Sequence, residues 1–84
     1  YPNPFNPTTS IEYDIFDDSF VKITVFDMAG GIVDVLANEK QDAGRKKILW
    51  NATTDLGAPV SSGIYFYKIE VNGSHQIKRM MYLK

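Results

Sequence analysis

The side chains that could do chemistry in this 84-residue sequence are one histidine, several serines and a set of aspartates. His75 follows an Asn72-Gly73 pair, so we expect it in an exposed loop rather than in a catalytic site. A serine nucleophile would need that histidine as its base, and no Gly-x-Ser-x-Gly turn surrounds any of the serines. The sequence therefore predicts no enzyme activity.

The aspartates gather at predicted turns, where carboxylates could bind calcium. Asp14, Asp17 and Asp18 are close in sequence, but none shows the Asp-x-Asp-x-Asp-Gly spacing of a dedicated calcium loop. Hydrogen bonding to turn amides explains them more simply. With no cysteine, the chain has neither disulfides nor a thiolate zinc site. We expect no metal ion and no cofactor.

The elements that would position these side chains are strands, because apolar residues alternate with polar ones along most of the chain. Turn residues separate the apolar runs, and no segment repeats apolar residues at helical spacing. Asn72-Gly73 predicts a type I′ hairpin, since both residues tolerate a positive φ. The predicted strands lie around residues 11–15, 21–25, 33–36, 46–50, 65–71 and 76–84.

Short strands with frequent turns predict an all-β fold, an Ig-like antiparallel β-sandwich of about six to seven strands. Residues 1–84 should form a single domain, with a proline-rich lead-in at 1–7 and the sandwich at 8–84. The prolines make the lead-in stiff, and Phe5 should anchor it to the core. Trp50 should sit between the two sheets.

Charge is distributed unevenly along the chain. Residues 1–44 carry two Lys and eight Asp/Glu, net −6, and residues 45–84 carry seven Lys/Arg and two Asp/Glu, net +5. One interpretation is that acidic and basic strands pair. The other is a basic C-terminal face that steers an acidic partner. Nucleic acid is not the expected partner, because no nucleic-acid-binding motif accompanies the basic cluster at residues 45–47.

Several motifs together resemble one family. They are Tyr-Pro-Asn-Pro-Phe-Asn-Pro-Thr-Thr at the start, Val25-Phe26-Asp27 with Gly30, Gly44 before Trp50, Ser-Gly-Ile-Tyr-Phe-Tyr at 62–67, and Lys-Arg-Met-Met-Tyr-Leu-Lys at 78–84. In this order they resemble the C-terminal sorting domain of the type IX secretion system. That family is similar in turn to the Ig-like part of the flagellar hook-capping protein.

The resemblance implies a non-catalytic sorting signal. It would direct an upstream cargo domain of the same polypeptide through the outer-membrane secretion machinery and its sorting-signal receptor. The cargo would pass the periplasm of a Gram-negative-type bacterium and reach the cell surface or the medium. The alternative is a structural or adhesive Ig-like module, including a carbohydrate-binding one. A sorting signal should end its gene product at Lys84, whereas a spacer can be followed by more protein.

No segment reaches the ~20 apolar residues that span a bilayer, so we expect no membrane insertion. Residues 1–15 also lack the features of a signal peptide, so if the domain is exported we expect the exporting signal to lie upstream or to be of another kind. Within the sorting hypothesis, partner binding is assigned to the last strand: Lys78, Arg79 and Lys84 as charged contacts, and Met80, Tyr82 and Leu83 holding the strand in its sheet. Structural roles are assigned to Pro4, Phe5, Pro7, Trp50, Gly63, Tyr65 and Tyr67.

Overall fold

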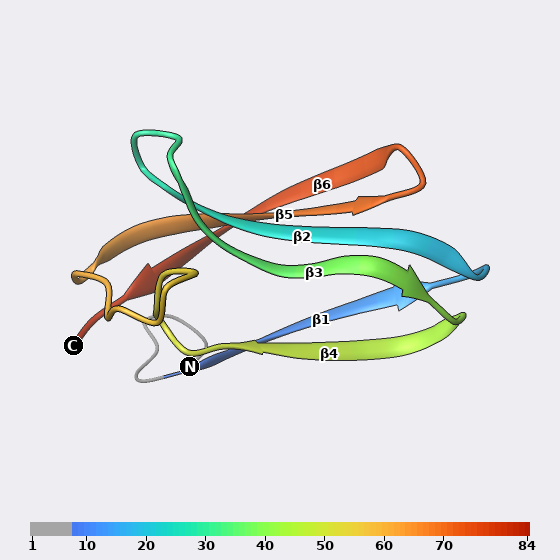
Figure 1. Ribbon diagram of the computed structural model, residues 1–84, viewed down its shortest axis with the longest axis horizontal. Coiled ribbons are helices and arrows are strands. Elements are labelled where there is room, and N and C mark those ends of the chain that lie inside the picture. The colour runs from blue at the N-terminus through green and yellow to red at the C-terminus, as the bar shows by residue number, and fades with distance from the viewer. Residues whose placement is uncertain (1–7) are drawn as a thin grey trace.

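A computed structural model describes residues 8–84, which form six strands and no helix (Figure 1). The strands are β1 (Thr9–Ile15), β2 (Ser19–Asp27), β3 (Ile32–Gln41), β4 (Gly44–Trp50), β5 (Gly63–Val71) and β6 (Ser74–Tyr82). All six predicted strands are therefore present. The expected anchor Phe5 and the structural prolines Pro4 and Pro7 lie outside the described residues.

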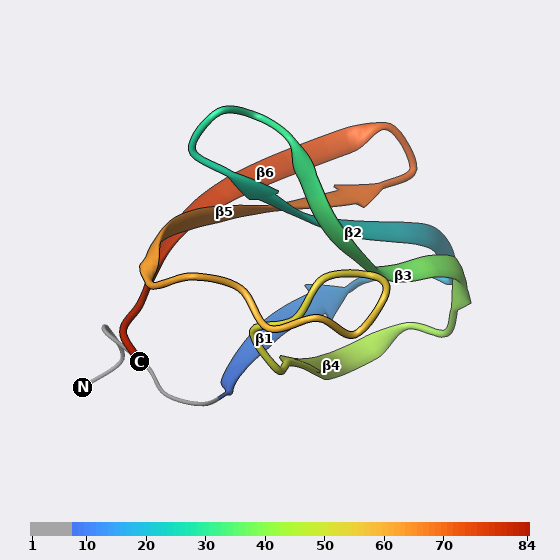
Figure 2. The same cartoon turned by 60° about the vertical axis from the view of Figure 1, so that its left-hand side comes forward.

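The strands form two antiparallel sheets. β1 and β4 make a two-stranded sheet, and the other sheet has the order β3-β2-β5-β6. Figures 1 and 2 show the two-stranded sheet lying against one face of the four-stranded sheet. Each sheet buries one face, which is why apolar and polar residues alternate along the strands. The prediction of an all-β sandwich is confirmed.

The predicted bounds of two strands, β3 and β6, were wrong, and β6 ends at Tyr82 rather than at Lys84. β3 extends to Gln41, well past the predicted end at Leu36, because its polar second half still pairs with β2. That pairing contains register shifts at Ile23/Thr24 and Val25/Phe26, and irregularities of this kind change which residues face the core. β6 begins at Ser74, so His75 lies in a strand rather than in a loop, although it is exposed.

The core fills the space between the sheets in two adjoining clusters. One is built around Trp50, whose ring contacts Tyr65 edge-on at 5.3 Å between ring centroids. The other gathers aliphatic side chains of β1, β2 and β5, including Ile11, Ile23 and Ile69. Trp50 is 1% exposed, which confirms that it lies between the sheets.

Charge pairing between strands is confirmed for β1 and β4. The Arg45 guanidinium of β4 lies 2.9 Å from the Glu12 carboxylate and 3.6 Å from that of Asp14, both on β1. The hydrogen bond that Arg45 donates to the Glu12 carboxylate, together with the charge of Asp14, raises the pKa of Arg45. All three side chains are largely exposed, so this group specifies which strands pair more than it stabilises the fold.

Candidate functional site

The candidate site is the β5–β6 hairpin together with the residues after it. Asn72 and Gly73 form its turn with φ values of 46° and 89°, as a type I′ turn requires. The Asn72 side chain also ties this turn to β2: its Oδ1 accepts a hydrogen bond from the Phe20 amide at 3.0 Å, and its Nδ2 donates one to the Ser19 hydroxyl at 3.2 Å. The predicted hairpin is confirmed.

Strand β6 lies at the edge of the four-stranded sheet, with β5 as its neighbour on the inner side. Its first six residues are all exposed, and its last three alternate between buried and exposed. Met80 and Tyr82 are 4% and 7% exposed and belong to the cluster around Trp50. The inner face of the last part of β6 thus completes the core, and the strand has one described neighbour in its sheet, β5.

The six residues assigned to partner binding fall into two groups. Met80 and Tyr82 hold β6 against the core, as expected. Leu83 does not, because it follows the end of β6 and is 46% exposed. Lys78, Arg79 and Lys84 are exposed, and the ion pairs found between residues 8 and 84 use Arg45 and Lys68 instead. Three cations and one exposed leucine are therefore available on this side of the domain.

The residues assigned structural roles on β5 differ in how firmly they are held. Tyr65 is 7% exposed, and its hydroxyl donates a hydrogen bond to the Ser61 carbonyl at 2.7 Å. Tyr67 is partly buried beside both core clusters. Gly63 is the first residue of β5 and pairs with Tyr82 of β6. A Cβ added at Gly63 would contact no other atom. The geometry gives no steric reason for a glycine at this position.

The residues considered for chemistry are not assembled into a reactive site. Asp27 Oδ1 accepts hydrogen bonds from the Ala29 and Gly31 amides at 3.0 and 2.8 Å, which is turn capping. Asp18 does the same for the Ala43 amide. Between residues 8 and 84, no three His, Asp or Glu side chains converge as a metal site would need. The same residues contain no helix long and apolar enough to cross a membrane.

The family model for the secretion system C-terminal sorting domain matches residues 1–83. The chain belongs to this family. The sorting domain is a signal of type IX secretion, and this function was expected from the motifs at both ends of the sequence. No curated protein matches the sequence significantly.

Two solved structures share the fold of this sorting domain. The dimeric latent PorU of Porphyromonas gingivalis matches with a TM-score of 0.76 and 22% identity, over 99% of this chain and 9% of that one. FlgD of P. aeruginosa matches with a TM-score of 0.69 and 20% identity, over 86% of this chain and 58% of that one. The sorting domain thus corresponds to a small part of the PorU chain. The likeness to FlgD agrees with the expected similarity to the hook-capping Ig-like domain.

Proposed function

We propose that the secretion machinery recognises this sorting domain through the outer edge of β6 and the exposed residues near its end. The upstream cargo is then carried from the periplasm to the cell surface or the medium. One observation carries the proposal: β6 is an edge strand with two exposed cations, Lys78 and Arg79, and a third, Lys84, follows it. Nothing in the domain needs to be catalytic for this role.

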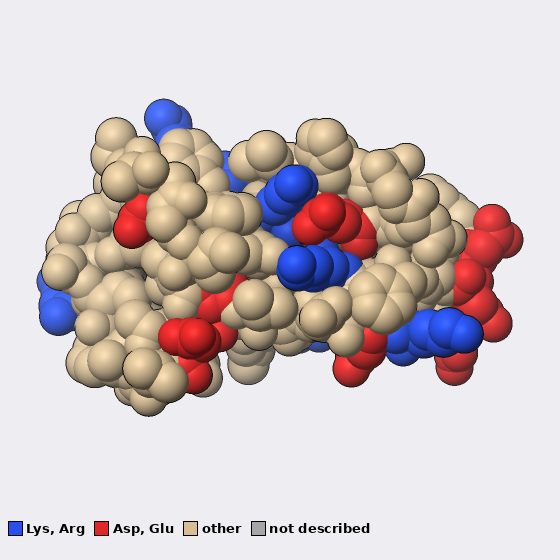
Figure 3. Space-filling view, turned by 45° about the horizontal axis from the view of Figure 1, so that its top comes forward, with Lys and Arg blue, Asp and Glu red and all other residues tan. Residues whose placement is uncertain are grey.

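An edge strand can be recognised by strand addition. Main-chain hydrogen bonds then supply affinity, and the side chains on alternate positions supply selectivity. The exposed cations favour an acidic receptor surface, because opposite charges increase the rate of encounter and disfavour wrong partners. Figure 3 shows Lys/Arg and Asp/Glu side chains interspersed on the face it presents. The two cations of β6, Lys78 and Arg79, are consecutive residues, so they project to opposite faces of the strand and do not form a basic face.

A secretion assay with matched charge variants tests these cations. The domain is fused behind a signal peptide and a reporter in a bacterium with a type IX system. The Lys78→Gln/Arg79→Gln/Lys84→Gln variant should fold normally and leave more reporter in the periplasm. The control, Lys40→Gln/Lys46→Gln/Lys47→Gln, removes the same charge from β3 and β4 and should be secreted like the wild type. Equal secretion of both variants would show that the β6 cations are not recognised.

Truncation must be designed around the core. Deleting residues 80–84 removes Met80 and Tyr82, both of which are buried, so lost secretion could follow from lost folding. Deleting only Leu83 and Lys84 leaves every core side chain in place. We expect this shorter deletion to keep the melting temperature of the domain and to reduce surface delivery. Unchanged delivery would place recognition within β6 itself.

A further inference from the structure

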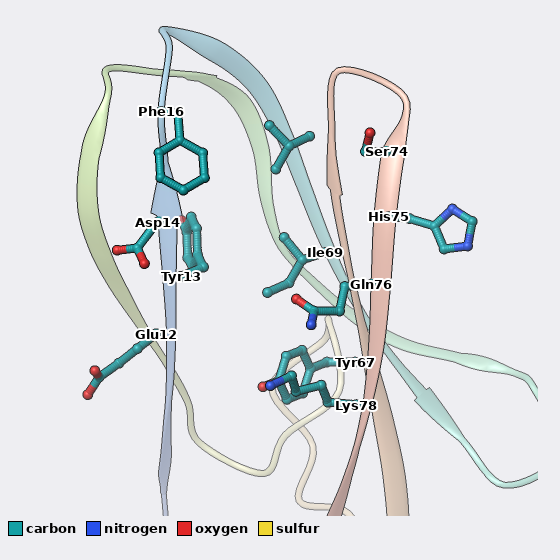
Figure 4. A pocket seen from close by; sticks show the side chains of 11 residues that line it. Glu12, Tyr13, Asp14, Phe16, Tyr67, Ile69, Ser74, His75, Gln76 and Lys78 are labelled. Carbon is teal, nitrogen blue, oxygen red and sulfur yellow. The ribbon is translucent and has the colours of Figure 1, made fainter.

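A groove lies between β1 and the β5–β6 hairpin. It has a volume of about 380 Å³, and side chains of all three strands line it together with Phe16, which follows β1. In Figure 4, β1 borders one side and β6 the other, with Tyr67 and Ile69 of β5 between them. Pockets that bind ligands have volumes of roughly 300 to 1,000 Å³. The groove can therefore hold a small ligand or a few residues of an extended chain.

The β6 wall of the groove is formed by side chains on the core-facing side of the sheet. The register sets Lys78 opposite Tyr67 and Gln76 opposite Ile69, and residues opposite each other in a strand pair point to the same side. Tyr67 and Ile69 pack in the core, so Gln76 and Lys78 point to that side as well. Both are nevertheless exposed. Figure 4 shows them pointing into the groove, whereas His75 points away from it.

The carboxylates of β1 do not neutralise Lys78. Figure 4 shows Glu12 and Asp14 pointing away from β5 and β6. Arg45 of β4 holds them there, at 2.9 Å from Glu12 and 3.6 Å from Asp14. Lys78 takes part in none of the ion pairs found between residues 8 and 84. An anionic group that enters the groove would therefore face a cation rather than a carboxylate.

The other end of the groove is apolar. Ile69 and Val71 of β5 lie there, and the Phe16 side chain is 90% exposed. Tyr13 also lines the groove, and its hydroxyl donates a hydrogen bond to the Gln41 side chain at 2.8 Å, which fixes the position of the ring. An apolar group bound at this end would remove the Phe16 ring from water, which is favourable.

The spacing between the two ends matches that of an extended chain. Ile69 lies two residues from Tyr67, which is opposite Lys78, and two residues of a strand span about 6.6 Å. In an extended segment, side chains two positions apart point the same way and are separated by the same distance. Such a segment in the groove can place an apolar side chain against Ile69 and a carboxylate beside Lys78.

We propose that the groove binds an extended segment of the secretion machinery in which an apolar residue and an acidic residue are two positions apart. The apolar side chain lies against Ile69 and Phe16, and the carboxylate pairs with Lys78. This inference rests on the proposed function, because it names the kind of partner surface that recognises Lys78. It extends recognition from β6 to a groove that three strands form. Arg79 projects from the opposite face of β6 and does not touch this segment.

Synthetic peptides test binding to the 84-residue chain by nuclear magnetic resonance. The probes are acetyl-Thr-Val-Thr-Glu-Thr-amide and acetyl-Thr-Glu-Thr-Val-Thr-amide, because the segment can run along the groove in either direction. At least one of them should shift the backbone amide signals of Ile69 and Lys78. Replacing its Glu by Gln should weaken binding by about threefold, since the peptide then lacks the charge that pairs with Lys78.

Matched variants locate the binding surface. Lys78→Glu should weaken binding of the Glu peptide by about fivefold or more, and a peptide with Lys in place of Glu should bind this variant as the Glu peptide binds the wild type. Arg79→Glu makes the same charge change on the opposite face and should alter the affinity by less than about twofold. Phe16→Ser should also weaken binding. Leu56→Ser replaces a residue that is 91% exposed and outside the groove, and should have no effect.

The secretion assay separates this inference from the proposed function. Phe16→Ser should leave more reporter in the periplasm, and Leu56→Ser should be secreted like the wild type. If neither peptide binds at roughly 5 mM, while Lys78→Gln/Arg79→Gln/Lys84→Gln still reduces secretion, the groove inference is wrong and the proposed function stands. Normal secretion of Phe16→Ser would show that the machinery does not use the groove. Peptide binding with normal secretion of the triple variant would contradict both.

Two further measurements would assign the groove to another occupant and overturn the proposal. The compound 3-phenylpropionate has an apolar ring and a carboxylate but no extended backbone, so equally tight binding of it would indicate a small-molecule site. Shifts of the Ile69 and Lys78 signals that grow with the concentration of the chain alone would indicate a second copy. Circular dichroism of each variant ensures that loss of folding is not counted as loss of binding.

Discussion

The indole nitrogen of Trp50 donates a hydrogen bond to the carbonyl oxygen of Thr53 at 3.0 Å, although the Trp50 side chain is almost wholly buried. The bond links the end of β4 to the loop of residues 51–62, which carries the chain from the two-stranded sheet to β5. Trp50 therefore fills the core and also fixes the path of this connection. A polar group buried at this depth needs such a partner.

Replacing Trp50 should separate these two roles. Trp50→Ala should lower the free energy of unfolding by about 3 to 5 kcal/mol, because it leaves a large cavity. Trp50→Phe keeps much of the volume but leaves the Thr53 carbonyl without its donor, so it should cost less than the alanine. Urea unfolding followed by circular dichroism measures both. A loss below about 1 kcal/mol for the alanine would contradict the buried position of the indole.

Asn72 offers a test of the hairpin turn. Asn72→Ala loses the hydrogen bonds to Phe20 and Ser19 and places alanine at a φ of 46°, so it should cost about 1 to 3 kcal/mol of stability. Asn72→Gly loses the same hydrogen bonds but adopts the turn without strain, and should cost less. Chemical denaturation compares the two. If glycine proves as harmful as alanine, backbone strain at this residue is not the cause.

The pair Met80 and Met81 tests which face of β6 supports the fold. Met80 is 4% exposed and Met81 is 38% exposed, one residue apart on the same strand. Met80→Ala should cost about 2 to 5 kcal/mol, whereas Met81→Ala should cost clearly less, because it creates no core cavity. Thermal melts of the two variants give the comparison. Similar losses would mean that β6 is turned differently from what is described above.

Alkaline pH should destabilise the domain through its buried tyrosines. Burial, followed by the charges of Asp27 and Tyr82, raises the pKa of Tyr65 above 10.0, and burial raises that of Tyr67. The folded state then keeps protons that the unfolded state releases. The stabilising contribution is complete below the unfolded pKa of about 10 and is lost as the pH rises through the folded-state pKa.

The measurement is the free energy of unfolding across this alkaline range. Tyr65→Phe/Tyr67→Phe should show a shallower decline than the wild type, since it lacks both groups. Tyr65→Phe also loses the hydrogen bond to Ser61, so its stability at neutral pH should fall by about 1 kcal/mol. Equal slopes for wild type and double variant would contradict the assignment to these two tyrosines.

Much of the fold could be predicted because the alternation of apolar and polar residues along a strand indicates which side chains face the core. The buried positions of Ile11, Ile23 and Trp50 follow from it. The length of β3 did not, because its second half is polar and exposed and belongs to the sheet only through hydrogen bonds with β2. The order of the strands in the two sheets could not be predicted either, since alternation does not indicate which strands are neighbours.

For the candidate site, the sequence predicted the terminal strand and its cations. It did not predict which of the apolar side chains near the end of the chain are buried. Leu83 resembles a core residue by type, yet β6 ends before it, and its exposure depends on where the sheet stops. The groove between β1 and β6 had no signal in the sequence. It arises from the relative placement of two sheets whose strands lie far apart along the chain.

The strand pairings also imply an order of assembly. In the β5–β6 hairpin, paired residues are separated by 3 positions (Val71 and Ser74) to 19 positions (Gly63 and Tyr82). β1 and β4 pair across 29 positions (Ile15 and Gly44) to 41 positions (Thr9 and Trp50). Since closing a longer loop costs more chain entropy, local pairs form first. By the same argument β2 and β5, which pair across 38 positions (Asp27 and Tyr65) to 50 positions (Val21 and Val71), come together after β1 and β4. We therefore expect the strand that carries the proposed signal to pair with β5 early, and the resulting hairpin to join β2 late.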